Sequence, residues 1–183
     1  MKPIALAACL FLLLSCLSTA SALPDIQIIM TANLPIPIMI QYSQVCRDCQ
    51  PIGGSGKTPF IIEARSYRGA MTLTAPAAVA WEGRTYLFSG WNTVDSYFAS
   101  CNRAQGFQPT IDTAYAAYYT LAGDVTRDGR VNLLDLIKVR NRMLTGGGDE
   151  HCGEYDANRD GAVNVLDLIY IRNHLGSKAP DAE

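Results

Sequence analysis

An internal repeat in the last third of the chain constrains the fold more than any other feature of the 183-residue sequence. Residues 124–141 read DVTRDGRVNLLDLIKVRN, and residues 156–173 read DANRDGAVNVLDLIYIRN. The two segments are offset by 32 positions, and 12 of their 18 residues are identical. Such self-similarity indicates two copies of one supersecondary unit.

Each copy has the spacing of a calcium-binding loop. A calcium ion takes about six to eight oxygen ligands, and a 12-residue loop supplies them from its odd positions and its last position, with glycine at position six. Gly129 and Gly161 occupy position six. The predicted ligands are Asp124, Thr126, Asp128, the carbonyl of Arg130, Asn132 and Asp135 in the first loop, and Asp156, Asn158, Asp160, the carbonyl of Ala162, Asn164 and Asp167 in the second. We therefore expect two calcium ions.

Two details distinguish these loops from the common helix–loop–helix calcium site. The last ligand is Asp rather than Glu in both copies. At position three, Thr126 offers a hydroxyl where Asn158 offers an amide carbonyl. We expect the first loop to bind calcium more weakly than the second.

A helix is predicted after each loop. Asn132 and Asn164 are good N-cap residues, and an Asp follows each cap three positions later. The helices are expected to end near Leu144 and Leu175, where glycines follow. An apolar stripe on each helix is predicted to pack against the other, formed by Leu134, Ile137 and Met143 and by Leu166, Ile169 and Leu175. The segments before the loops show no helical pattern.

This combination resembles the dockerin family over about residues 122–177. The resemblance rests on Gly123-Asp124-Val125, on the duplicated loops ending in Asp, and on Asp-Leu-x-x-x-Arg in each helix. It implies a small all-α module with two EF-hand-like loops, which binds calcium and docks a cohesin domain. Such modules attach proteins to polysaccharide-degrading, cellulosome-like assemblies or to cell surfaces.

The resemblance also implies positions that contact the partner. They are Leu133, Leu134, Arg140 and Asn141 in the first helix, and Val165, Leu166, Arg172 and Asn173 in the second. Because the two sets are nearly duplicated, two docking orientations related by a half-turn are expected. An alternative interpretation places Leu134 and Leu166 in the core of the module and leaves only the Arg and Asn residues exposed.

The preceding residues are predicted to form an all-β, immunoglobulin-like sandwich. Short runs rich in Ile, Thr, Tyr and Phe alternate with turn formers. The predicted strands are 25–30, 36–45, 59–63, 71–74, 84–91, 108–111 and 114–120, with a bulge at Gly90 and a flexible turn over 52–58. Residues 50–120 also resemble a β-sandwich repeat of bacterial surface proteins, through Thr58-Pro59-Phe60, Leu73-Thr74-Ala75-Pro76-Ala77, Tyr86-x-Phe88-x-x-Trp91 and Ala116-Ala117-Tyr118. That resemblance implies a spacer or interaction module.

The aromatic residues of this β module allow two interpretations. A stacking platform for carbohydrate would use Trp81, Trp91, Tyr97, Phe98, Tyr115 and Tyr119. Alternatively, Trp91 and Phe88 fill the core and the tyrosines line the strands, since aromatic residues favour strands in any case. Trp81 lies beside a turn, so it is the aromatic residue expected to be most exposed.

The N-terminus predicts export. Residues 1–22 combine a charged start, an apolar stretch and Ala20-Ser21-Ala22, a signal-peptidase site, and the apolar stretch is too short for a membrane anchor. A lipoprotein cleavage before Cys16 is the alternative. After cleavage at Ala22, the cysteines left are Cys46, Cys49, Cys101 and Cys152. Structural disulfides are favoured over zinc or redox chemistry. Pairing of Cys46 with Cys49 and of Cys101 with Cys152 is one of three possibilities.

Charge divides the chain at the same place as the motifs. The net charge is -2, and residues 23–120 carry six basic and six acidic side chains while residues 121–183 carry eight and eleven. This distribution gives no basic surface for nucleic acid. The chain is thus read as a multidomain protein: a signal peptide (1–22), a β module (23–120), a dockerin module (121–178) and a tail (179–183). A non-catalytic adaptor that binds cohesin is expected, and a calcium-stabilised surface or polysaccharide-binding protein without that partner is the alternative.

Overall fold

The computed structural model describes residues 25–45, 50–65, 69–93, 101–146 and 154–180. Within these ranges, nine strands are followed by two helices. Several sequence-based predictions fall on residues outside them, namely the signal peptide, Cys16, Cys46, Cys49, Cys152, Tyr97, Phe98 and residues 181–183. The export signal and the disulfide pairing therefore stay predictions.

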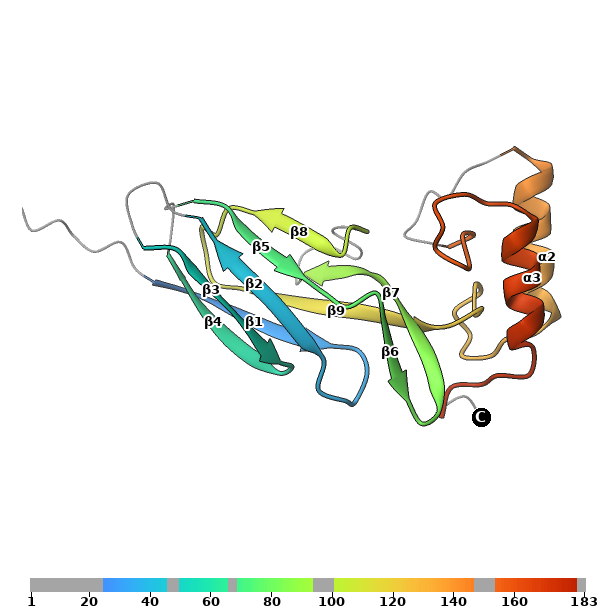
Figure 1. The fold of residues 1–183 in the computed structure, drawn as a ribbon, viewed down its shortest axis with the longest axis horizontal. Helices are drawn as coiled ribbons and strands as arrows, with labels where there is room; N and C mark the ends of the chain where they lie inside the picture. The colour runs from blue at the N-terminus through green and yellow to red at the C-terminus, as the bar shows by residue number, and fades with distance from the viewer. Residues whose placement is uncertain (1–24, 46–49, 66–68, 94–100, 147–153, 181–183) are drawn as a thin grey trace, which may run out of the picture.

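Two β-sheets form the N-terminal module (Figure 1). One sheet has five strands in the order β4-β1-β9-β7-β6, and the other has four in the order β3-β2-β5-β8. Among the described strands, neighbours are antiparallel except β1 and β9, which run parallel. The strands are β1 (Asp25–Ala32), β2 (Met39–Gln44), β3 (Ile52–Lys57), β4 (Phe60–Arg65), β5 (Met71–Thr74), β6 (Ala78–Trp81), β7 (Arg84–Thr93), β8 (Ala104–Phe107) and β9 (Thr113–Leu121). An all-β N-terminal module is confirmed.

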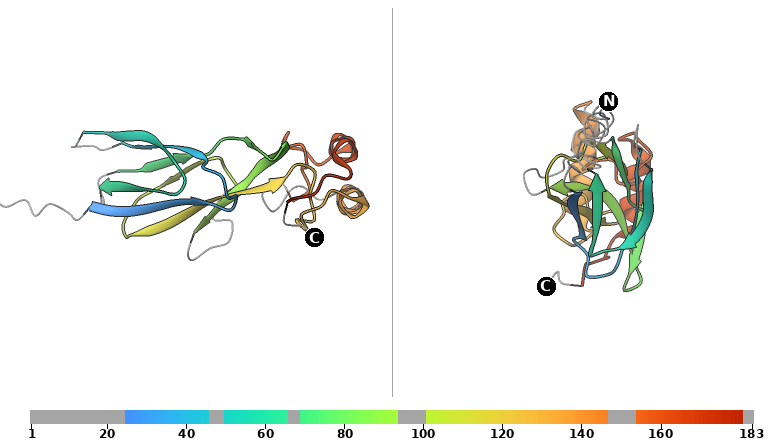
Figure 2. Two further views of the ribbon diagram at one scale, coloured as in Figure 1. Left: turned by 90° about the horizontal axis from the view of Figure 1, so that it is seen from below. Right: turned by 90° about the vertical axis from the view of Figure 1, so that its left-hand side faces the viewer.

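Alternating side chains bury one face of each sheet. In β9 every second residue from Tyr115 to Leu121 is buried, as the two-residue repeat of a strand requires. Ile28 from the five-stranded sheet and Leu73 from the four-stranded sheet belong to one buried cluster. The two sheets therefore lie face to face around a shared core, and Figure 2 shows them as two layers.

Aromatic side chains fill the centre of this core. Trp91 is 0% exposed, and its indole N–H donates to the carbonyl of Asn102 at 3.0 Å. Phe88 makes edge-to-face contacts with Trp91 and Tyr119, with ring centroids 5.5 and 5.6 Å apart. The prediction that Trp91 and Phe88 fill the core is confirmed. The predicted bulge is also present, since the β7–β9 register shifts between Phe88 and Gly90.

The interpretation of the aromatic residues as a stacking platform is wrong for Trp91, Tyr115 and Tyr119. Trp91, Tyr115 and Tyr119 are buried in the core, because each lies on the inward face of its strand. Trp81 is partly buried, with its ring 5.7 Å from the ring of Tyr86. Trp81 is therefore the least buried of these four side chains, as its place beside a turn predicted.

Three strands were missed by the sequence analysis, and one predicted strand is absent. Residues 52–57 pair with β2 rather than forming a flexible turn, residues 78–81 pair with β7, and residues 104–107 pair with β5. The predicted strand at 108–111 is irregular in the structure. Gly-rich or small-residue segments have weak strand propensity, so only their cross-strand hydrogen bonds make them strands.

Glycine in β3 is required by neighbouring rings. A Cβ at Gly56 would lie 2.5 Å from the Phe60 ring, and one at Gly54 would lie 2.9 Å from the Tyr42 hydroxyl. Both distances are shorter than a carbon side chain tolerates. The glycines that suggested a turn instead let two aromatic side chains lie across the strand.

The C-terminal module contains helices α2 (Leu133–Leu144) and α3 (Val165–His174). Asn132 and Asn164 cap them as predicted, and each helix has a full capping box with its Asp three residues later. The predicted contact stripe is wrong in part: Leu134, Leu166, Ile169 and Leu175 are exposed. Leu136, Val139 and Met143 also recur at helical spacing, and this stripe joins the core together with Leu168 and Ile171.

Only Ala122 and Gly123 separate β9 from the first loop. Gly123 has φ +88, and a Cβ there would lie 3.2 Å from both His174 and Val131. Glycine is required at this position both by its backbone conformation and by close approach of α3. The module of helices therefore lies directly against one end of the two-sheet β module (Figure 1). In the described part of the chain, no helix has the length and apolar composition needed to cross a bilayer.

Candidate metal centre

The carboxylates of the first loop are oriented by backbone N–H groups. The two oxygens of Asp124 accept hydrogen bonds from Gly129 N at 2.8 Å and from Asp128 N at 3.2 Å. Asp128 accepts one from Arg130 N at 2.9 Å. At the far end of the loop, Asp135 accepts from Thr126 N and Asn132 N, both at 2.8 Å. The Thr126 hydroxyl lies 2.9 Å from an oxygen of Asp135 and 3.4 Å from one of Asp124, so these three predicted ligands point toward one another.

The second loop repeats this arrangement. Asp156 accepts hydrogen bonds from Gly161 N at 2.8 Å and Asp160 N at 3.1 Å. Asp167 accepts from Asn158 N at 3.1 Å and Asn164 N at 2.7 Å. Gly129 and Gly161 have φ +81 and +93. The sequence repeat is therefore a structural repeat, down to the hydrogen bonds of individual carboxylate oxygens.

Predicted ligands at position nine are engaged elsewhere. The side-chain oxygen of Asn132 accepts from Leu134 N at 2.7 Å, and that of Asn164 accepts from Leu166 N at 2.7 Å. Both amides thus cap helices. Ligation from this position is often through water, which leaves the cap intact.

Four carboxylates of the two loops are buried. Asp135 and Asp167 are 0% exposed, and Asp124 and Asp156 are nearly so. Burial raises the pKa of Asp124 to about 6, and the neighbouring Asp135 and Asp128 carboxylates act in the same direction. Burial also raises the pKa of Asp167. Buried carboxylates are costly unless they are paired or bind a metal, so this donor set fits a hard cation.

Acidic side chains by themselves do not complete either site. Among the described residues, no three His, Cys, Asp or Glu side chains come together as a metal cluster. Calcium accepts carbonyl, hydroxyl and water oxygens as readily as carboxylates. The remaining oxygens of the predicted set come from Thr126 or Asn158 and from the carbonyls of Arg130 and Ala162.

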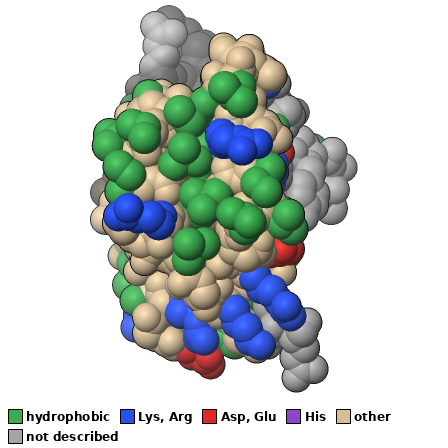
Figure 3. Space-filling view, turned by 90° about the vertical axis from the view of Figure 1, so that its right-hand side faces the viewer, with side chains coloured by type: hydrophobic (Ala, Val, Ile, Leu, Met, Phe, Trp, Pro, Cys, Tyr) green, Lys and Arg blue, Asp and Glu red, His purple; other side chains and the backbone are tan. Residues whose placement is uncertain are grey.

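The predicted partner-contacting residues lie on the surface of the helices. Leu133, Leu134, Val165 and Leu166 are 65, 58, 56 and 51% exposed. The alternative that Leu134 and Leu166 are core residues is wrong. Arg140, Asn141, Arg172 and Asn173 are exposed as well. Figure 3 shows apolar side chains gathered on this end of the molecule, with Lys and Arg side chains among them.

The last described residues form a clasp on the first loop, which the sequence analysis missed. Val131 N donates to Ser177 O at 2.8 Å, Gly176 N to Val131 O at 2.9 Å, and Ala179 N to Gly129 O at 2.7 Å. These bonds use backbone atoms alone, so no residue pattern predicts them. They join the two ends of the repeated region.

Comparison with known families agrees with this geometry. Residues 122–176 match the dockerin type I domain. The C-terminal module is a dockerin domain. The match covers both loops and both helices, and the β-rich region before it fits a separate N-terminal module. No curated protein matches the chain. Dockerin domains are non-catalytic, typically bind calcium, and generally assemble with cohesin domains in extracellular or cell-surface complexes.

Proposed function

We propose that this chain is an exported, non-catalytic adaptor in which the dockerin domain, loaded with two calcium ions, binds a cohesin domain. Through this contact the N-terminal module, which we take to be an immunoglobulin-like sandwich, is attached to a polysaccharide-degrading assembly or to a cell surface. The observation that carries the proposal is the duplicated loop, with the same carboxylate hydrogen bonds in both copies.

Calcium would act on the fold of the dockerin domain. When bound, the ion supplies the positive charge that the clustered carboxylates lack. The loops carry three carboxylates each, two of them buried, and without a cation these groups repel one another. The capping boxes link each loop to its helix, because Asp135 and Asp167 belong to both. Ordering the loops therefore orders the helices that present the apolar surface.

The exposed apolar residues supply the contact surface. Leu133 and Leu134 begin α2, and Val165 and Leu166 begin α3. Large apolar side chains exposed in this way mark protein interaction sites. Because the repeat places the same kind of surface on both helices, either helix is expected to serve as the main contact.

A pull-down of the full chain with a panel of cohesin domains tests this function. Binding is expected in calcium and lost in a chelator. Replacing Leu133 and Leu134 with Glu leaves the α3 contact available, as does the matching change of Val165 and Leu166. Only the four-residue variant is expected to lose binding.

The control for that series is Ile61→Glu. Ile61 lies on β4, is 56% exposed and belongs to the β module. This variant is expected to bind as the unmodified chain does. Binding that survives both the chelator and the four-residue change would contradict the proposal.

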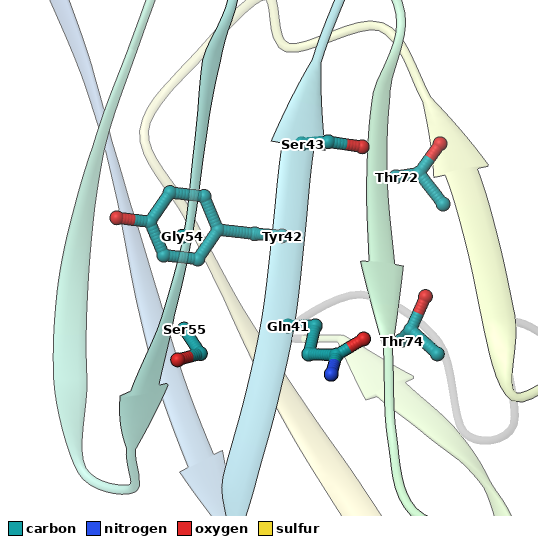
Figure 4. A pocket seen from close by; sticks show the side chains of 7 residues that line it. All are labelled: Gln41, Tyr42, Ser43, Gly54, Ser55, Thr72 and Thr74. Carbon is teal, nitrogen blue, oxygen red and sulfur yellow. The ribbon is translucent and has the colours of Figure 1, made fainter.

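A carbohydrate-binding role is the second candidate, and one surface of the β module favours it. A shallow pocket on the four-stranded sheet is lined by Gln41, Tyr42, Ser43, Gly54, Ser55, Thr72 and Thr74 (Figure 4). These groups are uncharged, and their hydroxyls and amide both donate and accept hydrogen bonds. Such a lining suits a neutral, polyhydroxylated ligand.

Glycan-array binding by the full chain tests this second role. Gln41→Ala is expected to reduce binding, whereas Gln108→Ala, at an exposed position outside the pocket, is expected to leave it unchanged. Binding that is equal for the two variants would remove the pocket from consideration. A calcium chelator is expected to leave glycan binding unchanged while it abolishes cohesin binding, because no predicted calcium ligand lines the pocket.

A further inference from the structure

An arginine of the second calcium loop contacts the β module. Arg159 Nη2 donates to the hydroxyl of Ser89 at 2.9 Å, across 70 residues of sequence. Ser89 lies on β7 and is 1% exposed. Its hydroxyl is also 2.6 Å from that of Thr120 on β9. The guanidinium therefore contacts β7 directly and is linked to β9 through the Ser89 hydroxyl.

The loop itself holds Arg159 in place. Arg159 lies between the predicted ligands Asn158 and Asp160, and its backbone is left-handed with φ +62. The next two residues, Asp160 and Gly161, donate their N–H groups to the carboxylate of Asp156. The direction of the arginine thus depends on the same hydrogen bonds that shape the metal site.

The first loop faces the β module in the same way. Arg127 occupies the equivalent position, with φ +63, and lines a crevice together with Trp81 and Asp124. The helices α2 and α3 lie farther from the β-sandwich, at the end of the molecule (Figure 1). The calcium loops are therefore the seam between the two modules, while the exposed apolar surface of the helices stays accessible.

We propose that calcium in the second loop secures the β module to the dockerin domain through the Arg159–Ser89 hydrogen bond. Arg159 and Ser89 act as positioning residues: they set how the β module is oriented relative to the partner-binding helices. The inference rests on the proposed calcium binding. The inference predicts that calcium stabilises the β module, although that module contributes no ligand to the ion.

The chain carries its own reporters for this effect. Both of its tryptophans, Trp81 and Trp91, lie in the β module. Trp91 is fully buried in the core of that module, so tryptophan fluorescence follows its thermal unfolding, whereas Trp81 also lines the crevice beside the first loop. Calcium is expected to raise the Tm of this transition by about 4 °C, as one hydrogen bond to a charged group implies for a protein of this size.

Two variants remove the contact from opposite sides. Arg159→Ala and Ser89→Ala are each expected to lose the calcium-dependent rise in Tm, whatever their Tm without calcium. Ser89 lies outside the loop, so its variant still decides the question if the arginine variant binds calcium poorly. Lys57→Ala removes an exposed cation of β3 and is expected to keep the rise.

Calorimetric titration with calcium distinguishes a failure of the Arg159–Ser89 inference from a failure of the proposed calcium binding. Uptake of two ions by Ser89→Ala together with loss of the rise supports the inference. Uptake of two ions with an unchanged rise in both variants overturns it and leaves the calcium proposal intact. Absence of calcium uptake by the unmodified chain overturns both.

Discussion

Asp135 and Asp167 show how one side chain serves a loop and a helix together. Each is fully buried, and each accepts one N–H from position three of its loop and one from the N-cap residue. A carboxylate with these partners is fixed in direction before any ion arrives. Aspartate rather than glutamate at the last loop position is consistent with this short reach.

Removing either carboxylate is expected to remove one calcium site. For Asp135→Ala and for Asp167→Ala, calorimetric titration should show uptake of one ion instead of two, because position twelve contributes charge and orders the loop. The remaining site in Asp135→Ala should be the tighter one, since Asn158 offers a better ligand than Thr126. A tighter site in Asp167→Ala would contradict that ranking, and Glu82→Gln, an exposed turn residue, is the control.

Calcium binding is expected to weaken as the pH falls through about 6. Burial raises the pKa of Asp124 to about 6 in the metal-free fold, and calcium needs the ionised carboxylate. Below that pH the ion must displace a proton, so the apparent affinity falls; above it, no proton is released from this group. Calorimetry at pH 5 and pH 7.5 in buffers of different ionisation enthalpy measures both effects. Equal affinity at the two pH values would contradict the expectation.

At the scale of elements, β3 shows why composition misleads for short strands. Its sequence is rich in glycine, yet it pairs with β2 along its length. The absence of side chains at Gly54 and Gly56 lets the Tyr42 and Phe60 rings cover the strand. In this strand the glycines make room for aromatic side chains and do not form a turn.

Gly56→Ala is expected to destabilise the β module by about 1–3 kcal/mol, the usual cost of overpacking. The added methyl would meet the Phe60 ring at 2.5 Å. Gly106→Ala is the matched control in β8, where a Cβ meets nothing within 4 Å. It should be neutral or stabilising by a few tenths of a kcal/mol. Denaturant unfolding followed by tryptophan fluorescence compares the two, and an equal effect would refute the packing argument.

At the scale of the whole molecule, the dockerin domain is closed by contacts between its ends. Residues 176–179 pair with residues 129–131 of the first loop, and Gly123 lies against His174 of α3. Lys138 on α2 donates to Val125 O at 3.0 Å and forms an ion pair with Glu154 at 2.9 Å. The two repeats are therefore held together as one module, joined to the β module at the repeated loops.

Truncation after Leu175 is expected to weaken calcium binding in the first loop more than in the second. It removes three backbone hydrogen bonds to residues 129–131 and none to the second loop. Truncation after Pro180 keeps these bonds and serves as the control. Calorimetry should show an about tenfold weaker first site for the shorter chain, corresponding to about 1.4 kcal/mol for the lost bonds. An equal loss at both sites would argue against a local role of the clasp.

The sequence alone determined most of the dockerin domain. The loop spacing, the N-caps and the position of both helices follow from local rules, because a metal loop and a capping box each need particular residues within a few positions. The strands β7 and β9 and the burial of Trp91 were also predicted, since runs of aromatic and β-branched residues favour strands wherever they pair.

Only the tertiary structure decided which apolar stripe of each helix is buried, and that β3, β6 and β8 are strands. It alone shows that the C-terminus clasps the first loop and that Arg159 reaches Ser89. These features depend on pairing partners elsewhere in the chain, from the next strand of a hairpin for β6 to a residue 70 positions away for Arg159, or on backbone atoms common to every residue. Local sequence patterns carry the chemistry of a loop, whereas contacts between distant segments exist only once the chain has folded.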